Sequence, residues 1–231
     1  MNRIDTDVAL ELASHEGLVR QAYRDSQGVW TWSIGVTSVS GHDVTRYIGR
    51  PQPLEHCLAV YAWLLERRYA PALRDAFRGR VLTQAQFAAA LSFHYNTGAI
   101  ARAAWVRLWR AGDTAGARRA FMEWNRPAAL LPRRRQECAL FFDAAWSHDG
   151  GVTEFTRLTA GAMPEPSSAR RLDIRAEMAE ALRAGMGAPV TPPSATHARP
   201  DPPAGTTLAA TPPRPATMPA AALAGGLFPI R

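Results

Sequence analysis

The aromatic and apolar residues of this chain are unevenly distributed, and this limits where a hydrophobic core can form. All seven Trp lie before position 150, whereas residues 188–231 contain 11 of the 18 Pro and a single aromatic residue, Phe228. A segment of that composition cannot bury enough apolar surface to offset the entropy lost on ordering. We therefore expect residues 188–231 to form a disordered Pro/Ala/Thr-rich tail, and the core to be built from the residues before it.

Within residues 1–187 the sequence predicts a small β-region followed by helices. The turn residues Asp25–Gly28 precede the β-rich run Val29–Ile34, which predicts a β-hairpin or small meander. Helical periodicity and capping residues predict helices near 6–16, 54–77 (broken near Pro71), 84–97, 100–110, 114–124, 132–145 and 172–183. Residues 151–171 show neither pattern and are expected to be irregular.

This pattern predicts an α+β fold, mainly helical, in which a connecting helix joins a β-containing lobe to a larger helical lobe. We expect one domain at 1–150, an irregular segment with a short helix at 151–187, and the tail at 188–231. A cleft between two lobes is a common place for a ligand.

The composition excludes several classes of function. The net charge is +7, all basic side chains are Arg, and they are spread along the chain without a dense basic arm or a recognition motif, so nucleic-acid binding is not expected. No apolar run reaches the ~18 residues that span a bilayer, so stable membrane insertion is not expected. Two Cys cannot form a disulfide scaffold, and the His residues lack metal-ligand spacing, so we expect neither metal nor cofactor.

Two carboxylates and a hydroxyl are spaced so that one pocket can hold them. Glu16 ends the first predicted helix, Asp25 lies in the hairpin turn, and Thr31 lies on the returning strand. A carboxyl in a dry site keeps its proton and can act as an acid, whereas one in a polar turn stays ionised. Glycoside hydrolysis needs such a pair, although an arbitrary Glu/Asp pair is more often two surface acids.

The residues around this pair resemble the phage-type lysozymes of glycoside hydrolase family 24. The first matching block comprises Ser14–Leu18, Ala22–Asp25, Gly28–Thr31 and Gly35–Thr37. The second comprises Thr83–Phe87, Ala90–Gly98, Ala111–Asp113, Phe121–Trp124 and Arg133–Glu137. Order and spacing agree across both blocks, so the resemblance covers roughly residues 5–147 and is specific. It implies a lysozyme-like fold with the catalytic domain at 1–150.

The resemblance also assigns roles to individual residues. It implies that Glu16 is the general acid, that Asp25 is the second carboxylate and that Thr31 positions a water. It further implies a substrate-binding cleft lined by Ser33, Gly35, Tyr95, Asn96 and Arg134. Of these, Arg134 is the best match for an Arg that pairs with the catalytic Glu. Trp30 and Trp32 alternate on a short predicted strand, so one ring can face the cleft, and we expect Trp30 to bind substrate there.

Two positions depart from the family pattern. Ser33 stands where the family usually has Gly, and Val36 where it usually has His. We expect Ser33 to narrow or reshape the sugar cleft. Loss of the His removes a structural ion-pair partner and leaves the catalytic set intact.

The implied activity is that of a muramidase, which hydrolyses the β-1,4 bond between N-acetylmuramic acid and N-acetylglucosamine in peptidoglycan glycan strands. Because Thr31 can hold a water beside Asp25, we expect inversion. The implied role is that of a phage or prophage endolysin, acting as a monomer. The charged N-terminus lacks the h-region of a signal peptide. We therefore expect the protein to stay cytoplasmic until a holin or cell breakage releases it to the wall.

Two alternatives remain open from the sequence. A lytic transglycosylase cleaves the same bond with one Glu and no hydrolytic water, and would release anhydro-muramic products; Asp25 and Thr31 argue against it. A non-catalytic wall-binding virion component would keep the fold and the binding without turnover.

Overall fold

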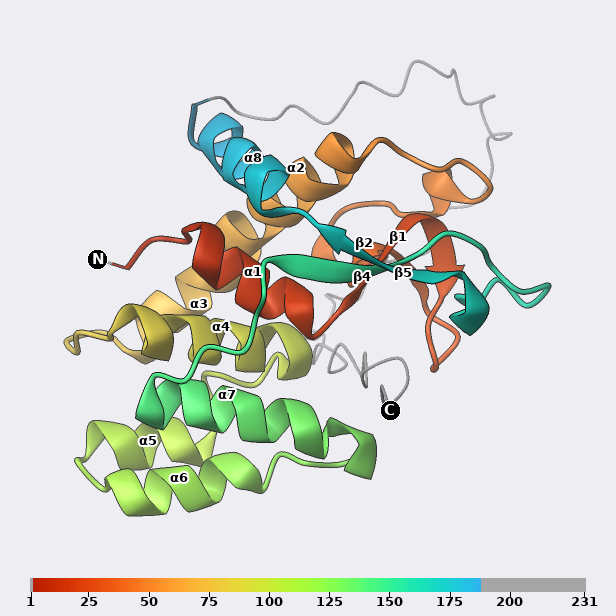
Figure 1. Ribbon diagram of the computed structural model, residues 1–231. Coiled ribbons are helices and arrows are strands. Elements are labelled where there is room, and N and C mark those ends of the chain that lie inside the picture. Colours follow the sequence, from red (N-terminus) through yellow and green to blue (C-terminus); the bar gives the residue numbers. More distant parts are fainter. Residues whose placement is uncertain (1, 188–231) are drawn as a thin grey trace, which may run out of the picture.

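The computed structural model describes residues 2–187, and they form a mixed α+β fold that is mainly helical, as the sequence predicts (Figure 1). The predicted disordered tail at 188–231 lies outside the described residues. A sheet with α1 (Thr6–Ser14) beside it forms one part of the molecule, and a layer of helices forms the other (Figure 1).

The sheet contains more strands than the sequence indicates. Its order is β3 (Val36–Thr37), β2 (Trp30–Ile34), β1 (Gly17–Arg24), β4 (Gly151–Phe155) and β5 (Ala169–Asp173). The predicted hairpin is confirmed, with Tyr23 opposite Thr31 in the antiparallel β1–β2 pair. β4 runs parallel to β1, and β5 is antiparallel to β4.

The expectation that residues 151–171 are irregular is therefore wrong. β4 gains its backbone partners from β1, which lies more than a hundred residues earlier, and no local pattern reports such a pairing. β5 is an exposed edge strand rich in Arg, so it lacks the apolar alternation by which a strand is recognised.

The helices largely follow the predicted pattern. They are α2 (Leu54–Leu64), a π-helical turn (Leu65–Tyr69), α3 (Ala70–Ala76), α4 (Gln84–Thr97), α5 (Ala104–Arg110), α6 (Thr114–Met122), α7 (Leu131–Asp143) and α8 (Arg175–Gly187). Asp5 caps α1 through its side chain, and Thr83 and Gln86 form the predicted capping box of α4. α8 begins later than predicted because residues 172 and 173 belong to β5.

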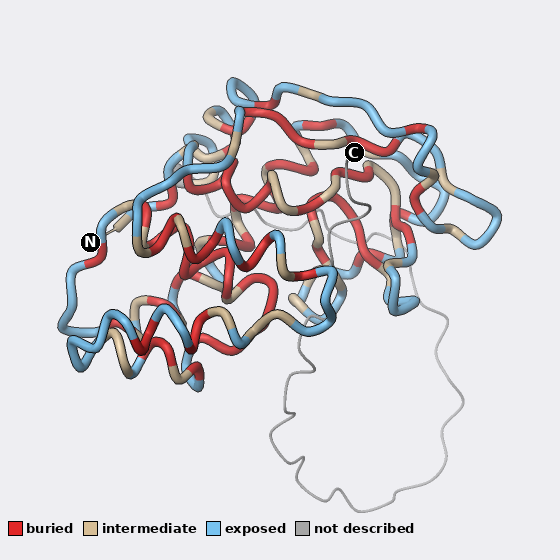
Figure 2. Tube along the Cα trace, turned by 60° about the horizontal axis from the view of Figure 1, so that its bottom comes forward, coloured by how far each residue is buried: buried red, intermediate tan, exposed pale blue. Residues whose placement is uncertain are grey.

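The core extends through both parts of the molecule. In the helical part, Phe93, Trp105, Phe121 and Phe141 pack ring against ring. Buried segments run through the middle of the fold and exposed segments lie around them (Figure 2). α8 packs against α1 and α2, so the C-terminal part of the described chain folds back onto its beginning.

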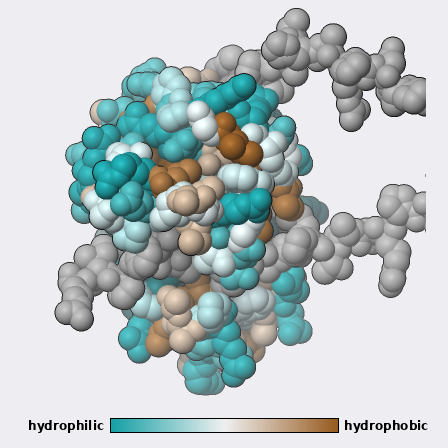
Figure 3. All heavy atoms as spheres, turned by 90° about the vertical axis from the view of Figure 1, so that its right-hand side faces the viewer, coloured by the Kyte–Doolittle hydropathy of each residue, from teal (hydrophilic) through white to brown (hydrophobic). Residues whose placement is uncertain are grey.

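The surface carries no large apolar area on the face seen in Figure 3, where hydrophobic side chains are scattered among hydrophilic ones. Within residues 2–187, we find no helix that combines the length and the apolar character needed to cross a membrane.

Candidate active site

Glu16 lies where α1 passes into β1, with its backbone amide donating to the carbonyl of Ala13. Its side chain is buried, and Arg133 Nη1 on α7 donates to its Oε1 at 2.6 Å. Burial raises the pKa of Glu16, and the charge of Arg133 only partly opposes this. The structure therefore holds a carboxyl that keeps its proton to higher pH than an exposed Glu, as a general acid requires.

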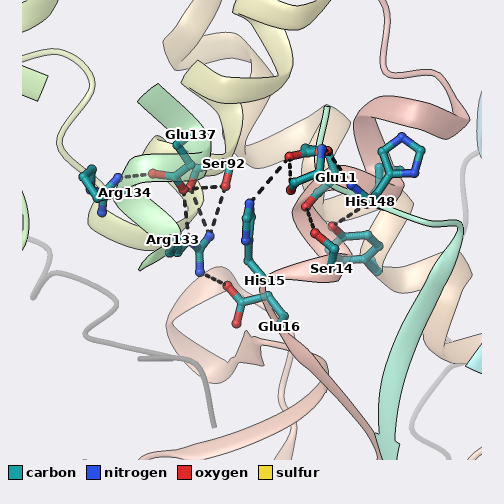
Figure 4. A network of polar contacts seen from close by, with 12 residues as sticks. Glu11, Ser14, His15, Glu16, Ser92, Arg133, Arg134, Glu137 and His148 are labelled. Carbon is teal, nitrogen blue, oxygen red and sulfur yellow. Dashed lines mark hydrogen bonds and ion pairs between the residues drawn. The ribbon is translucent and has the colours of Figure 1, made fainter. Parts of the chain in front are cut away.

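Arg133 connects Glu16 to a buried polar network (Figure 4). Its Nε donates to Oε1 of Glu137 at 2.9 Å, and its Nη2 donates to the carbonyl and hydroxyl oxygens of Ser92. Burial opposes ionisation of Glu137, but the charges of Arg134 and Arg133 outweigh burial and lower its pKa. Glu137 is thus a stable anion that fixes the guanidinium of Arg133 against Glu16.

The sequence expectation that Arg134 pairs with the catalytic Glu is wrong, because Arg133 does so. Arg134 is fully buried and donates instead to Glu137, to the carbonyl of Trp124 and to Oδ1 of Asn96, the last at 2.7 Å. Neighbouring helix residues point about 100° apart, so a one-residue error in register turns the side chain to another face. The spacing of Glu137, four residues after Arg133 and three after Arg134, is the sequence signal of this network.

Asp25 and Thr31 lie at the hairpin that follows β1. Asp25 is half-buried, and its Oδ1 accepts hydrogen bonds from the amides of Gln27 at 2.8 Å and Val29 at 2.9 Å. Thr31 is buried, and its hydroxyl donates to the carbonyl of Val29 at 3.2 Å. The turn therefore fixes the carboxylate through Oδ1 and leaves Oδ2 without a hydrogen bond to the described residues.

Gly35 and Tyr95 lie directly beside Glu16. Gly35 has φ +68°, and a Cβ at this position would be 3.2 Å from Oε2 of Glu16 and 3.2 Å from Cε1 of Tyr95. Only Gly fits this backbone conformation and this space without strain. Tyr95 is buried and donates its hydroxyl to the carbonyl of Ile34 at 2.6 Å. These two residues shape the wall around the acid.

Three other residues that were expected to line the cleft, Ser33, Asn96 and Trp30, differ in their burial and in their contacts. Ser33 is fully buried, has φ +55° and donates its hydroxyl to the carbonyl of Cys57 at 3.0 Å. The expectation that Ser33 lines the sugar cleft is therefore wrong, because its left-handed backbone turns the side chain toward α2. Asn96 is buried against Arg134, whereas Trp30 is half-buried with the guanidinium of Arg24 4.5 Å from its ring centroid.

The described residues contain no group of three or more His, Cys, Asp or Glu side chains arranged to hold a metal ion. The chemistry that these residues can perform is acid–base chemistry at two carboxylates. Sequence reasoning proposed both carboxylates but did not single out Arg133, Ser92 and Glu137 as the residues that support Glu16.

Comparisons with known proteins indicate the family of this chain. The phage lysozyme family model matches residues 13–137, more than half of the chain, and includes Glu16, Asp25, Thr31 and Arg133. No match is found among curated proteins. An endolysin from Escherichia coli O157:H7 phage FAHEc1 is similar in structure, with TM-score 0.55 and 24% identity over 64% of this chain and 97% of that chain. The muramidase domain of SpmX from Asticaccaulis excentricus gives TM-score 0.49 and 24% identity over 61% of this chain and 98% of that chain.

The endolysin supports the lysozyme-like fold, and the family match covers the residues around both carboxylates. The chain therefore belongs to the phage lysozyme family and is a peptidoglycan hydrolase of the glycosidase class.

Proposed function

We propose that the protein is a muramidase that hydrolyses the β-1,4 bond between N-acetylmuramic acid and N-acetylglucosamine. The observation that carries this proposal is the buried carboxyl of Glu16, which has a raised pKa and is held by Arg133 beside a hairpin whose turn orients Asp25. Two carboxyl groups in such different environments are suited to the two roles that glycoside hydrolysis requires.

In the proposed reaction Glu16 transfers its proton to the glycosidic oxygen as the bond to the anomeric carbon breaks. A water attacks the anomeric carbon from the opposite face, positioned by Thr31, and passes its proton to Asp25. The positive charge that develops on the sugar is stabilised by the Asp25 carboxylate. The anomeric configuration inverts, and no covalent intermediate forms.

The decisive experiment measures the clearing of purified peptidoglycan by wild type and by Glu16→Gln. We expect the substitution to reduce the rate at least about 100-fold, because the amide cannot supply the proton. Glu55→Gln, at an exposed acid on α2, is the matched control and should clear at the wild-type rate. Clearing by Glu16→Gln at a near wild-type rate would rule out this role of Glu16.

The products distinguish the proposed mechanism from its alternatives. NMR of the first product, before mutarotation, should show the α configuration from the β-linked substrate. A β product would mean retention, and an anhydro-muramic end would mean a lytic transglycosylase. Thr31→Glu should place a carboxylate where the water stands, and mass spectrometry should then detect a glycosyl-enzyme adduct.

We further propose that the protein acts as a monomeric endolysin in host-cell lysis. It would remain cytoplasmic until a holin or cell breakage admits it to the wall. The test is to express the protein in the cytoplasm with and without a co-expressed holin. Lysis should require both the protein and the holin. A variant with Glu16→Gln should fail to lyse even when the holin is present.

A further inference from the structure

The π-helical turn between α2 and α3 has a local cause in the sequence. In a regular α-helix, Pro71 would clash with the carbonyl of the residue four positions earlier, Arg67. The helix avoids this clash by widening over Leu65–Tyr69, where the amide of Ala70 donates to the carbonyl of Leu65, five residues back. Such turns are frequent at functional sites because they redirect one side chain out of the helical register.

Tyr69 ends this turn, and its ring packs on α4 near Glu16. Its centroid is 4.7 Å from that of Tyr95 and 5.5 Å from that of His94. Tyr95 in turn contacts Gly35 and lies beside the carboxyl of Glu16. Burial, and after it the charge of Glu16, raise the pKa of Tyr69 to about 12. The phenol is therefore a neutral hydrogen-bonding group close to the acid.

The hydroxyl of Tyr69 differs from most other Tyr hydroxyls of the described chain. Those of Tyr47, Tyr61 and Tyr95 are hydrogen-bonded to protein groups. The hydroxyls of Tyr23 and Tyr69 make no hydrogen bond within residues 2–187, but Tyr23 is 3% exposed inside a small apolar cluster. Tyr69 is half-buried, and its hydroxyl is not among the fully buried, unpartnered polar atoms of the described residues, so it keeps some contact with solvent. A Tyr hydroxyl at the edge of a buried region usually has a partner.

We propose that Tyr69 is a substrate-binding residue whose hydroxyl forms a hydrogen bond with a polar group of the sugar seated beside Glu16. This inference rests on the proposed muramidase function. The bond would be to a ring hydroxyl or an acetamido group of the glycan, and the ring would be held in place by Tyr95 and His94. Because the contact forms with both bound substrate and transition state, it contributes to KM and leaves kcat nearly unchanged.

The test is Tyr69→Phe, which keeps the ring and removes only the hydroxyl. With soluble glycan strands prepared from peptidoglycan, we expect KM to rise about 5- to 10-fold and kcat to stay within about twofold, as the loss of one hydrogen bond predicts. Melting temperature should not fall, because the hydroxyl has no hydrogen-bond partner to lose among the residues that the structure describes. Tyr47→Phe is the control: it breaks hydrogen bonds with His42 and His56, so it should lower the melting temperature without changing KM.

Each result has one meaning. A wild-type protein without activity on the strands would overturn the proposed function itself. An active wild type with an unchanged KM in Tyr69→Phe would overturn the role of Tyr69 alone. A raised KM accompanied by a lower melting temperature would also overturn it, since the hydroxyl would then support the fold. Titration of the same strands into the Glu16→Gln variant and into the Glu16→Gln/Tyr69→Phe double variant measures affinity directly. The double variant should bind more weakly by the same factor by which Tyr69→Phe raises KM.

Discussion

At the scale of single residues, the guanidinium of Arg133 contacts two carboxyl groups within one buried network. It donates to Glu16 and to Glu137, while Arg134 donates to Glu137 from another side. Two Arg therefore face two Glu, and the burial cost of each charge is offset by neighbours. Replacing any one of these groups leaves a buried neighbour without its hydrogen-bond partner, and of the two Arg only Arg133 donates to Glu16.

Arg133→Gln should therefore change both stability and the pH dependence of hydrolysis. Losing one partner of a buried network lowers the free energy of unfolding by about 3–5 kcal/mol. Loss of the cation also raises the pKa of Glu16 further, so the alkaline limb of the activity profile moves to higher pH. Arg134→Gln should lower the free energy of unfolding without moving the alkaline limb. Arg135→Gln, at an exposed neighbouring residue, should change neither the stability nor the alkaline limb. Urea denaturation and pH–rate profiles of the three variants test these expectations.

Buried His residues make the fold sensitive to acid. Burial lowers the pKa of His94 from 6.5 to about 4. Above pH 6.5 the His94 imidazole is mostly neutral in both the folded and the unfolded protein. Between pH 6.5 and 4 it binds a proton in the unfolded chain but not in the folded protein, so the free energy of unfolding falls as pH falls. His94→Gln should remove about 3 kcal/mol of the loss between pH 7 and pH 4, measured by urea denaturation. Equal losses in wild type and variant would contradict this.

At the scale of elements, the segment after α7 is tied to the segment that carries Glu16. Glu11 on α1 is fully buried and accepts from the amides of Ser147 and His148 at 3.0 and 3.1 Å. β4 then pairs with Gly17 and Leu18, directly after Glu16, and the ring of Phe155 packs against Gly17. β4 and the loop before it therefore support the chain on either side of the acid.

Glu11→Ala should test this attachment. It leaves the amides of Ser147 and His148 and the hydroxyl of Ser147 without their buried acceptor, so we expect the free energy of unfolding to fall by about 2–4 kcal/mol. Glu177→Ala, at an exposed acid of α8, should cost only a few tenths of a kcal/mol. Chemical denaturation measures both, and equal effects would show that Glu11 does not anchor the segment.

At the scale of the whole molecule, residues 145–187 belong to the same core as the family-matched region. Val152, Ile174 and Met178 are fully buried in the main core cluster. Their burial contributes about 1.5–3 kcal/mol for each side chain, which is a large part of the total stability of a domain. The composition of residues 188–231 predicts no comparable contribution.

Two truncations should therefore behave differently. A protein ending at residue 187 should melt within about 2 °C of the full chain and keep its activity on isolated peptidoglycan. A protein ending at residue 144 should lack a cooperative melting transition, because it exposes the apolar faces beneath β4 and α8. Calorimetry checks both. A large loss of stability on removing 188–231 would show that the tail docks on the core.

Local sequence signals determined much of this protein. The capping box at Thr83, the hairpin turn at Asp25 and the positions of Glu16 and Thr31 depend on residues close in the chain, so a single sequence predicts them. The family resemblance adds the proposed role of each carboxylate, because motif order and spacing are properties of the sequence.

Tertiary structure alone decided the rest. The β1–β4 pairing depends on contacts across more than a hundred residues, which no local pattern encodes. The choice of Arg133 over Arg134 as partner of Glu16 depends on how α7 is rotated against α1, and the burial of Ser33 depends on a single left-handed residue. Sequence periodicity places a residue on a helix or strand, whereas contacts between side chains require angles and distances that only the packed elements fix.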